Sequence, residues 1–151
     1  MEIHINLYFE NGAKLGKARD TVVGYILEYI TEKGPATYTK FERLENVTSE
    51  QAAALGLSKA FEEKWAKKSD EITVYTDDPA LKGAYGAGYM QKWIEKGWVT
   101  AGGKEKKHRE EWEAVNELIT AHKVDFVFDQ GHSYRNYLRH EVQKRINTQT
   151  K

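Results

Sequence analysis

The hydrophobic pattern of this chain changes once, after about residue 47, and the change limits the folds open to it. Upstream, apolar and polar side chains alternate in three runs, which are separated by turn residues at Asn11-Gly12 and Gly34-Pro35. Alternation with a period of two is typical of half-buried β-strands. The three runs cover residues 3–9, 21–27 and 37–44. We therefore expect the chain to begin with an antiparallel meander of three strands.

Downstream of this point, helical and strand-like patterns alternate. Thr48-Ser49 supplies an N-cap for a helix whose apolar stripe runs from Ala53 to Trp65. The later expected elements are a strand at 72–77, short helices at 81–87 and 89–96, an amphipathic helix through 112–119, a strand at 124–128 and a helix at 134–146. This order predicts an α/β fold, in the sense of an α+β mixed sheet, with five strands and four or five flanking helices. Residues 1–146 are expected to form one domain, followed by a frayed tail at 147–151.

Composition excludes several classes of protein. Lys and Arg balance Asp and Glu at 23 each, so an anionic partner has to be held by a local patch and not by a basic coat. The absence of cysteine excludes disulfides and thiolate metal sites. No apolar run approaches the roughly 20 residues of a membrane span, and the N-terminus reads as a strand and not as a signal peptide. We expect a soluble, cytoplasmic monomer with no membrane partner.

Three carboxylates stand where metal chemistry is commonly built. Asp77 ends the strand at 72–77, Glu10 ends the first strand, and Glu50 falls on the core-facing side of the first helix. Ligands of open α/β sheets bind at the carboxyl ends of strands, and carboxylate oxygens suit Mg²⁺. Simpler interpretations remain open at this stage, because Glu50 also favours the helix dipole and Glu10 can merely end a strand.

The order of elements resembles the ribonuclease H fold, and particular residues make the resemblance more specific. The second half of the chain is similar to a bacterial type 1 ribonuclease H at Val74–Asp77, Lys92-Trp93, Lys96–Trp98, Thr100–Lys104, Trp112, Glu117-Leu118 and Gly131–Ser133. Residues 73–112 carry the strongest part of this match, whereas residues 1–45 and the last helix match by order and spacing. The resemblance implies an endonuclease that hydrolyses the RNA strand of RNA–DNA hybrids, using two Mg²⁺ ions held by four acidic residues.

Carried over by position, the resemblance assigns catalytic and metal-binding roles to Glu10, Glu50 and Asp77. Glu50 and Asp77 match the family, whereas Glu10 stands where the family has Asp. The additional methylene moves the carboxylate outward by about 1.5 Å, and preorganised sites lose rate when groups move by ~1 Å. We expect the ions to shift accordingly or hydrolysis to be slow.

The fourth acidic position is the second departure. The register of the family puts His140 there, as a catalytic residue and metal ligand, with the neighbouring Glu141 as its substitute. A neutral imidazole is a weaker ligand for Mg²⁺ but can ligate Mn²⁺, so Mn²⁺ is a possible cofactor. Helical geometry instead favours Glu141, which lies beside the apolar stripe of the last helix. His132 resembles the family's loop histidine, which helps water attack or product release, although a plain turn histidine is an alternative.

Substrate contacts are expected on a basic and aromatic segment that resembles the family's basic protrusion. Its candidates are Lys92, Trp93, Lys96, Trp98, Lys104, Lys106 and Lys107. Lysines neutralise phosphates and indoles stack on sugars or bases. The alternative is a solvated lysine rim around core tryptophans, with Trp93 the more buried and Trp98 the more open. Asn46 and the amide of Gly12 are candidates for contacts to RNA 2′-hydroxyls, the groups that distinguish RNA from DNA.

Three functional hypotheses follow from the sequence. The first is an active ribonuclease H that depends on Mg²⁺ or Mn²⁺. The second is a catalytically weak or inactive module of this fold that binds RNA–DNA hybrid or duplex nucleic acid, which the changes at Glu10 and His140 favour. The third is a non-enzymatic interaction domain in which Asp77 is structural and the lysines contact an acidic protein partner.

Overall fold

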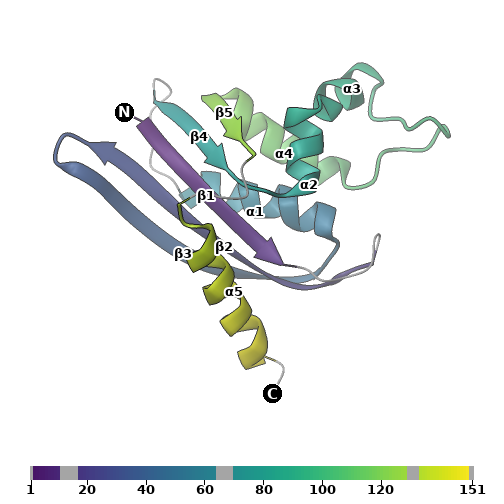
Figure 1. Ribbon diagram of the computed structural model, residues 1–151. Coiled ribbons are helices and arrows are strands. Elements are labelled where there is room, and N and C mark those ends of the chain that lie inside the picture. Colours follow the sequence, from purple (N-terminus) through teal and green to yellow (C-terminus); the bar gives the residue numbers. More distant parts are fainter. Residues whose placement is uncertain (1, 11–16, 64–69, 129–132, 150–151) are drawn as a thin grey trace.

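The protein was analysed as a computed structural model that describes residues 2–10, 17–63, 70–128 and 133–149 (Figure 1). Its strands are β1 (Glu2–Glu10), β2 (Arg19–Thr31), β3 (Gly34–Val47), β4 (Glu71–Tyr75) and β5 (Lys123–Val127). Its α-helices are α1 (Ser49–Glu63), α2 (Pro79–Leu81), α3 (Tyr89–Glu95), α4 (Arg109–Thr120) and α5 (Arg135–Gln149), and a π-helical turn, η1, covers Lys82–Gly86. None of the helices in these ranges is long and apolar enough to span a membrane.

The five strands form one mixed sheet in the order β3-β2-β1-β4-β5. The first three strands pair antiparallel, whereas β4 runs parallel to both β1 and β5. Asn6 of β1 lies opposite Tyr75 of β4, so the carboxyl ends of these two neighbours reach the same edge. The fold class predicted from the sequence is therefore confirmed.

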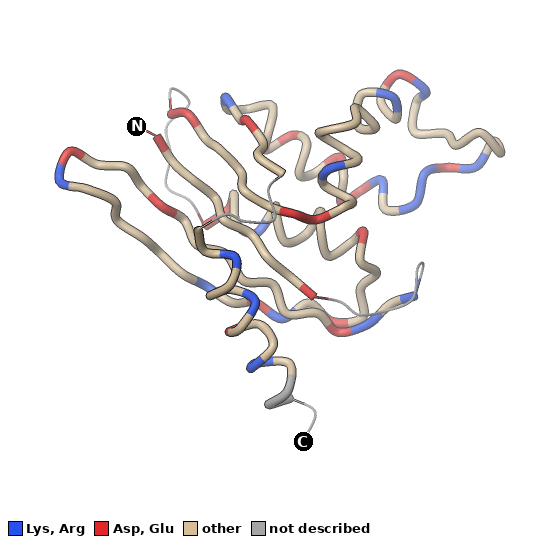
Figure 2. Tube along the Cα trace, in the orientation of Figure 1, with Lys and Arg blue, Asp and Glu red and all other residues tan. Residues whose placement is uncertain are grey.

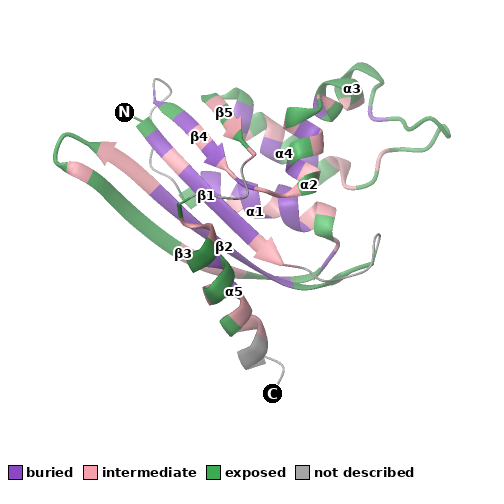
Figure 3. Ribbon diagram, in the orientation of Figure 1, coloured by how far each residue is buried: buried purple, intermediate pink, exposed green. Residues whose placement is uncertain are grey.

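The two faces of the sheet are covered by different layers. Ile3, Ile5 and Leu7 of β1 point into the main core, which α1 and α4 complete (Figures 1 and 3). The intervening residues face the other side, where Tyr8 packs in a smaller cluster with Leu138 of α5. This alternation follows from the pleat of a strand. Glu10, two residues after Tyr8, is therefore on the α5 side of the sheet.

Several element ends differ from the predicted ones. β2 and β3 are longer than the runs at 21–27 and 37–44, because their backbone pairing continues through polar residues to a tight turn at Gly34, where φ is +109°. β4 ends at Tyr75, so Asp77 lies in the turn after the strand and not within it. The helix predicted over 81–87 is largely the π-helical turn. The predicted extension of the first helix to Trp65 lies outside the described residues.

Candidate active site

Acidic residues collect at the edge of the sheet where β1 and β4 end (Figure 2). Glu10 is the last residue of β1, and Asp77 comes two residues after the end of β4. Thr76, next to Asp77, is tied to the end of β5 by a backbone hydrogen bond from its N–H to the Val127 carbonyl, at 3.2 Å. Two carboxylates from different parts of the chain thus reach one edge, as the strand pattern predicts.

Helix α5 supplies the hydrogen-bond donors that hold these two carboxylates. Arg135 Nε donates to Asp77 Oδ2 at 2.6 Å, and Gln143 Nε2 donates to Glu10 Oε1 at 3.1 Å. The Tyr8 hydroxyl also donates to Glu10, and the Arg135 guanidinium lies 5.6 Å from the centre of the Tyr8 ring. The hydrogen bond to Asp77 raises the pKa of Arg135, with the charges of Asp77 and Glu10 adding to the shift. Burial, together with Glu10, raises the pKa of the Tyr8 hydroxyl.

Glu50 faces a different set of partners, on the other side of the sheet. Lys106 Nζ donates to Glu50 Oε1 at 2.5 Å, and Trp112 Nε1 donates to the same oxygen at 2.9 Å. Lys106 is also 4.5 Å from the centre of the Trp93 ring, and only 14% of its side chain is exposed. Glu50 is thereby fixed against a cluster of two tryptophans and one lysine.

The start of α1 explains the direction of Glu50. Thr48 and Gln51 form a reciprocal cap, in which the Gln51 N–H donates to Thr48 Oγ1 at 3.1 Å and the Thr48 N–H donates to Gln51 Oε1 at 3.0 Å. His108, just ahead of α4, makes a 3.1 Å hydrogen bond with the Thr48 hydroxyl. Since Lys106 and Trp112 flank His108 in the sequence, this contact brings both of them to Glu50. The predicted N-cap at Thr48-Ser49 is confirmed at Thr48.

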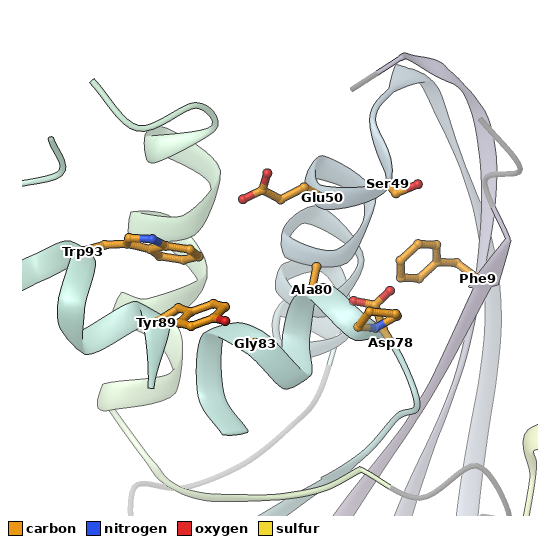
Figure 4. Close-up of a pocket in the computed structure, with 9 residues that line it drawn as sticks. Phe9, Ser49, Glu50, Asp78, Ala80, Gly83, Tyr89 and Trp93 are labelled. Carbon is orange, nitrogen blue, oxygen red and sulfur yellow. The ribbon is translucent and has the colours of Figure 1, made fainter. Parts of the chain in front are cut away.

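A pocket of about 560 Å³ lies between α1 and the turn after β4 (Figure 4). Its lining residues are Phe9, Ser49, Glu50, Asp78, Pro79, Ala80, Gly83, Tyr89 and Trp93. Asp78 accepts a hydrogen bond from the Leu81 N–H at 2.9 Å and so begins α2. Burial raises the pKa of Asp78 to about 6, and the neighbouring charge of Asp77 adds to this shift. Asp78 is not among the site residues predicted from the sequence, although its side chain lines the pocket.

The predicted metal-binding carboxylates share one edge but do not face one another. In the part of the chain that the structure describes, no three His, Asp or Glu side chains are grouped closely enough to hold a metal ion. Asp77 and Glu10 are turned to α5, and Glu50 is turned to Lys106. Their oxygens are nevertheless the donors that suit Mg²⁺, and two of them already attract a cationic side chain. The donor set therefore fits a divalent cation.

The two candidates for the fourth metal-binding position, His140 and Glu141, both lie on α5. Arg135 and Gln143 are eight residues apart, so they lie on the same face of the helix, and this face meets the strand ends. Glu141 is on another flank, where Arg145 lies 3.6 Å from its carboxylate and 3.7 Å from the centre of the Phe41 ring. His140 is exposed and lies one helical turn before Gln143. The choice between His140 and Glu141 therefore stays a prediction.

Comparison with known proteins gives a consistent picture. No protein-family model matches the chain. Ribonuclease H of Thermus thermophilus is 40% identical over 70 residues, which are 46% of this chain and 42% of that protein. Ribonuclease HI of Haemophilus ducreyi is 27% identical over 138 residues, covering 90% of this chain and 86% of that protein. The sequence is therefore similar to those of proteins named ribonuclease H and ribonuclease HI.

Solved structures agree with the ribonuclease H-like fold. The crystal structure of LC9-RNase H1, described as a type 1 RNase H with the type 2 active-site motif, superposes with a TM-score of 0.75 at 15% identity. That match covers 95% of this chain and 71% of the other. RNase H1 of the halophilic archaeon Halobacterium salinarum superposes with a TM-score of 0.64 at 16% identity, over 98% and 99% of the two chains. The chain spans less than half of the length of the Thermus relative in that match.

The basic segment of this ribonuclease H-like chain lies beside Glu50. Lys92, Trp93, Lys96 and Lys106 line a groove of about 260 Å³ together with Tyr89, Val99, Thr100 and Ala101. Lys104 and Lys107 are exposed on the loop that leads into α4 (Figure 2). The expected difference between the tryptophans is wrong, because Trp98 is only 7% exposed whereas Trp93 is intermediate and lines the groove. Trp98 is buried because its ring packs 6.1 Å from the Trp93 ring and 5.8 Å from the guanidinium of Arg109.

Asn46 is exposed near the end of β3, just before α1. Its φ of 51° is left-handed, a conformation that Asn tolerates better than most residues. Asp20 of β2 holds this end of β3, because its carboxylate accepts from the Asn46 N–H at 2.9 Å and from Arg43 at 2.5 Å. The Asn46 side chain is thus displayed on a braced backbone. Gly12 and His132, the other predicted loop contacts, lie outside the described residues.

Proposed function

We propose that this protein is an endonuclease that hydrolyses the RNA strand of RNA–DNA hybrids with two Mg²⁺ ions, or with Mn²⁺ in their place. The observation that carries the proposal is that Glu10 and Asp77 reach one edge of the sheet, while Glu50 lines the adjoining pocket with Phe9 and Asp78, beside a groove lined by lysines and Trp93. Relatives named ribonuclease H and ribonuclease HI support it. We propose one domain over residues 1–146 that acts as a cytoplasmic monomer.

In this proposal Glu10, Glu50 and Asp77 hold the divalent cations, and His140 completes the set, with Glu141 as the alternative. Such ions supply an activated water and stabilise the leaving oxygen of the phosphodiester. His132 assists water attack or product release. His140 is preferred to Glu141 because the Glu141 carboxylate is paired with Arg145 on the other flank of α5.

The chain's other residues bind and orient the hybrid. Lys92 and Lys96 on the groove, with Lys104 and Lys107 on the adjoining loop, neutralise phosphates of the DNA strand. Trp93, with the buried Trp98 packed against it, forms the wall on which a sugar or base rests. Lys106 packs against the Trp93 ring of this wall and also donates a hydrogen bond to Glu50. Asn46, with the amide of Gly12, reads the 2′-hydroxyls that mark the RNA strand.

The test is cleavage of an end-labelled RNA–DNA hybrid by the purified protein in Mg²⁺ and in Mn²⁺. Asp77→Asn removes a charged ligand with almost no change in size, and the expected loss of rate is at least about 100-fold. Glu71→Gln is the matched control, because Glu71 is an exposed carboxylate at the opposite end of β4. No cleavage in either metal by a folded protein would overturn the proposal. Cleavage that Asp77→Asn leaves unchanged would point to a contaminating nuclease.

A hybrid-binding module without hydrolysis is the second candidate. It is favoured by two contacts, Arg135 with Asp77 and Lys106 with Glu50, since each gives a proposed metal-binding carboxylate a cation from the chain itself. A binding titration at low salt separates the two functions, because the module retains hybrid affinity whereas neither metal supports cutting. The binding protein is also expected to lose affinity steeply as salt rises.

A further inference from the structure

Arg135 and Asp77 form an ion pair that is largely shielded from water. Only 24% of the arginine side chain and 17% of the aspartate side chain are exposed, and the Nε–Oδ2 distance is 2.6 Å. Shielding strengthens the attraction between the charges relative to a surface pair. The contact is therefore a specific feature of the proposed site and not an incidental surface bridge.

The position of Arg135 is fixed by its neighbours. Arg135 is the first residue of α5, and the preceding Tyr134 donates its hydroxyl to Glu28 Oε2 of β2 at 2.5 Å. Leu138, one turn further on, is fully buried against the sheet. These two contacts anchor the first turn of the helix, so the guanidinium reaches Asp77 from a fixed backbone. Glu10 is close enough for its charge to act on the same guanidinium.

From this geometry we infer that Arg135 sets the divalent-metal affinity of the site, by competing with the metal for the Asp77 carboxylate. The inference rests on the proposed function, because it concerns the same carboxylates. A cation that coordinates Asp77 through Oδ2 takes the oxygen that Arg135 uses, and the two positive charges repel. Metal binding and the ion pair therefore oppose each other, and each weakens the other by the same factor. Arg135 also keeps Asp77 neutralised when the metal concentration is low.

The experiment measures Mn²⁺ affinity by calorimetry, on the full chain and without nucleic acid. Arg135→Gln removes the competitor, and we expect it to bind Mn²⁺ at least about tenfold more tightly than the parent protein. Arg139→Gln is the matched control, because it removes the same charge from an exposed residue one turn along α5. We expect Arg139→Gln to change the Mn²⁺ affinity by less than about threefold, through its general electrostatic effect. Arg135→Lys retains a cation without the guanidinium and is expected to fall between the parent and Arg135→Gln.

The inference is wrong if Arg135→Gln tightens Mn²⁺ binding no more than Arg139→Gln does, or if neither variant nor parent binds Mn²⁺. Far-UV circular dichroism of each variant excludes a loss of fold as the cause, and Arg135→Lys provides a second comparison should Arg135→Gln unfold. Hybrid cleavage measured in parallel keeps the two proposals apart. Equal affinities with intact cleavage would overturn the role of Arg135 alone, whereas tighter binding by Arg135→Gln in a protein that never cuts would support that role and overturn the nuclease.

Discussion

The two halves of the acidic edge are held in different ways. Glu50 rests on the main core, since its partner Trp112 is fully buried and its other partner Lys106 lies over Trp93. Asp77 and Glu10 instead depend on α5, whose own core cluster is much smaller. Glu50 is thus fixed by the packed interior, whereas Asp77 and Glu10 are fixed by α5 on the opposite face of the sheet. The site can change on its α5 side without disturbing its Glu50 side.

The two halves also share a property. In each half, a basic side chain of the protein itself is paired with one of the carboxylates. Lys106 is enclosed by the tryptophan cluster, whereas Arg135 extends from the first turn of α5. Removing Lys106 therefore disturbs packing as well as charge, while removing Arg135 chiefly changes charge. For this reason Arg135 is the cleaner residue with which to test metal competition.

Trp112→Ala should produce the largest loss of stability. The indole is fully buried, so its removal leaves a large cavity and takes away one of the two hydrogen bonds that Glu50 accepts, and we expect the free energy of unfolding to fall by about 3–5 kcal/mol. Urea denaturation measures the change. Trp112→Phe separates the two causes, because it keeps most of the ring and loses only the hydrogen bond to Glu50, at about 1–2 kcal/mol. A loss below about 1 kcal/mol in Trp112→Ala would show that Glu50 does not depend on the core.

Asp78→Asn tests the electrostatics of the pocket wall between the two halves. The pKa of this carboxyl is raised from 3.8 to about 6 in the folded protein, so the folded state binds a proton more tightly than the unfolded chain. The resulting stability is complete below about pH 4 and is lost as pH rises through about 6. Because Asn caps helices as well as Asp does, Asp78→Asn should stabilise the protein by about 2 kcal/mol at pH 7 and have little effect at pH 4.

Urea unfolding of Asp78→Asn and of the parent protein, at pH 7 and at pH 4, checks the direction of this change in the free energy of unfolding. Asp125→Asn on β5 serves as the control, since Asp125 is exposed and its replacement should leave the pH dependence unchanged. Destabilisation by Asp78→Asn at pH 7 would mean that the charge of Asp78 is favourable where it stands. The pocket wall would then be more polar than its lining suggests.

Tyr8→Phe addresses the α5 half directly. It removes the hydroxyl that donates to Glu10 and keeps the ring in the small cluster beneath α5, so about 1 kcal/mol of stability should be lost. Gln143 still donates to Glu10, which limits the cost. The loss is measured as a shift of the thermal unfolding midpoint of Tyr8→Phe. Tyr134→Phe is measured in parallel for comparison, because it removes a hydroxyl from the other end of the interface between α5 and the sheet. No shift in Tyr8→Phe would show that Gln143 alone positions Glu10.

The shared edge of Glu10 and Asp77 could be predicted from the sequence, and the direction of Glu50 could not. The strand patterns predict the end of β1 at Glu10 and the end of β4 to within two residues, and parallel pairing then brings the two ends to the same edge. Glu50, by contrast, is directed by Lys106 and Trp112, which are 56 and 62 residues away. No local pattern encodes such a contact, because it depends on how α4 packs against α1.

Helix α5 shows the same limit. Its apolar stripe correctly identifies Leu138 and Val142 as buried, but the stripe does not say which flank meets the strand ends. That flank is set by where the helix crosses β1, and it carries Arg135 and Gln143, neither of which was predicted as a site residue. The spacing of these two residues, eight apart, is the only local signal, and it becomes informative once the position of the carboxylates is known.

Paired substitutions on α5 give the smallest expected effect and decide the fourth position. His140 is exposed and Glu141 is partly buried beside Arg145, so His140→Ala should change the free energy of unfolding by less than about 0.5 kcal/mol. If His140 is the fourth ligand, its loss should weaken Mn²⁺ binding by up to about tenfold, whereas Glu141→Ala should leave the affinity unchanged. Calorimetric titration of both variants makes the comparison. The reverse result would require α5 to turn its Arg145 flank toward Glu10 when the metal binds, which would break the contact between Gln143 and Glu10 and make the α5 half of the site the part that moves.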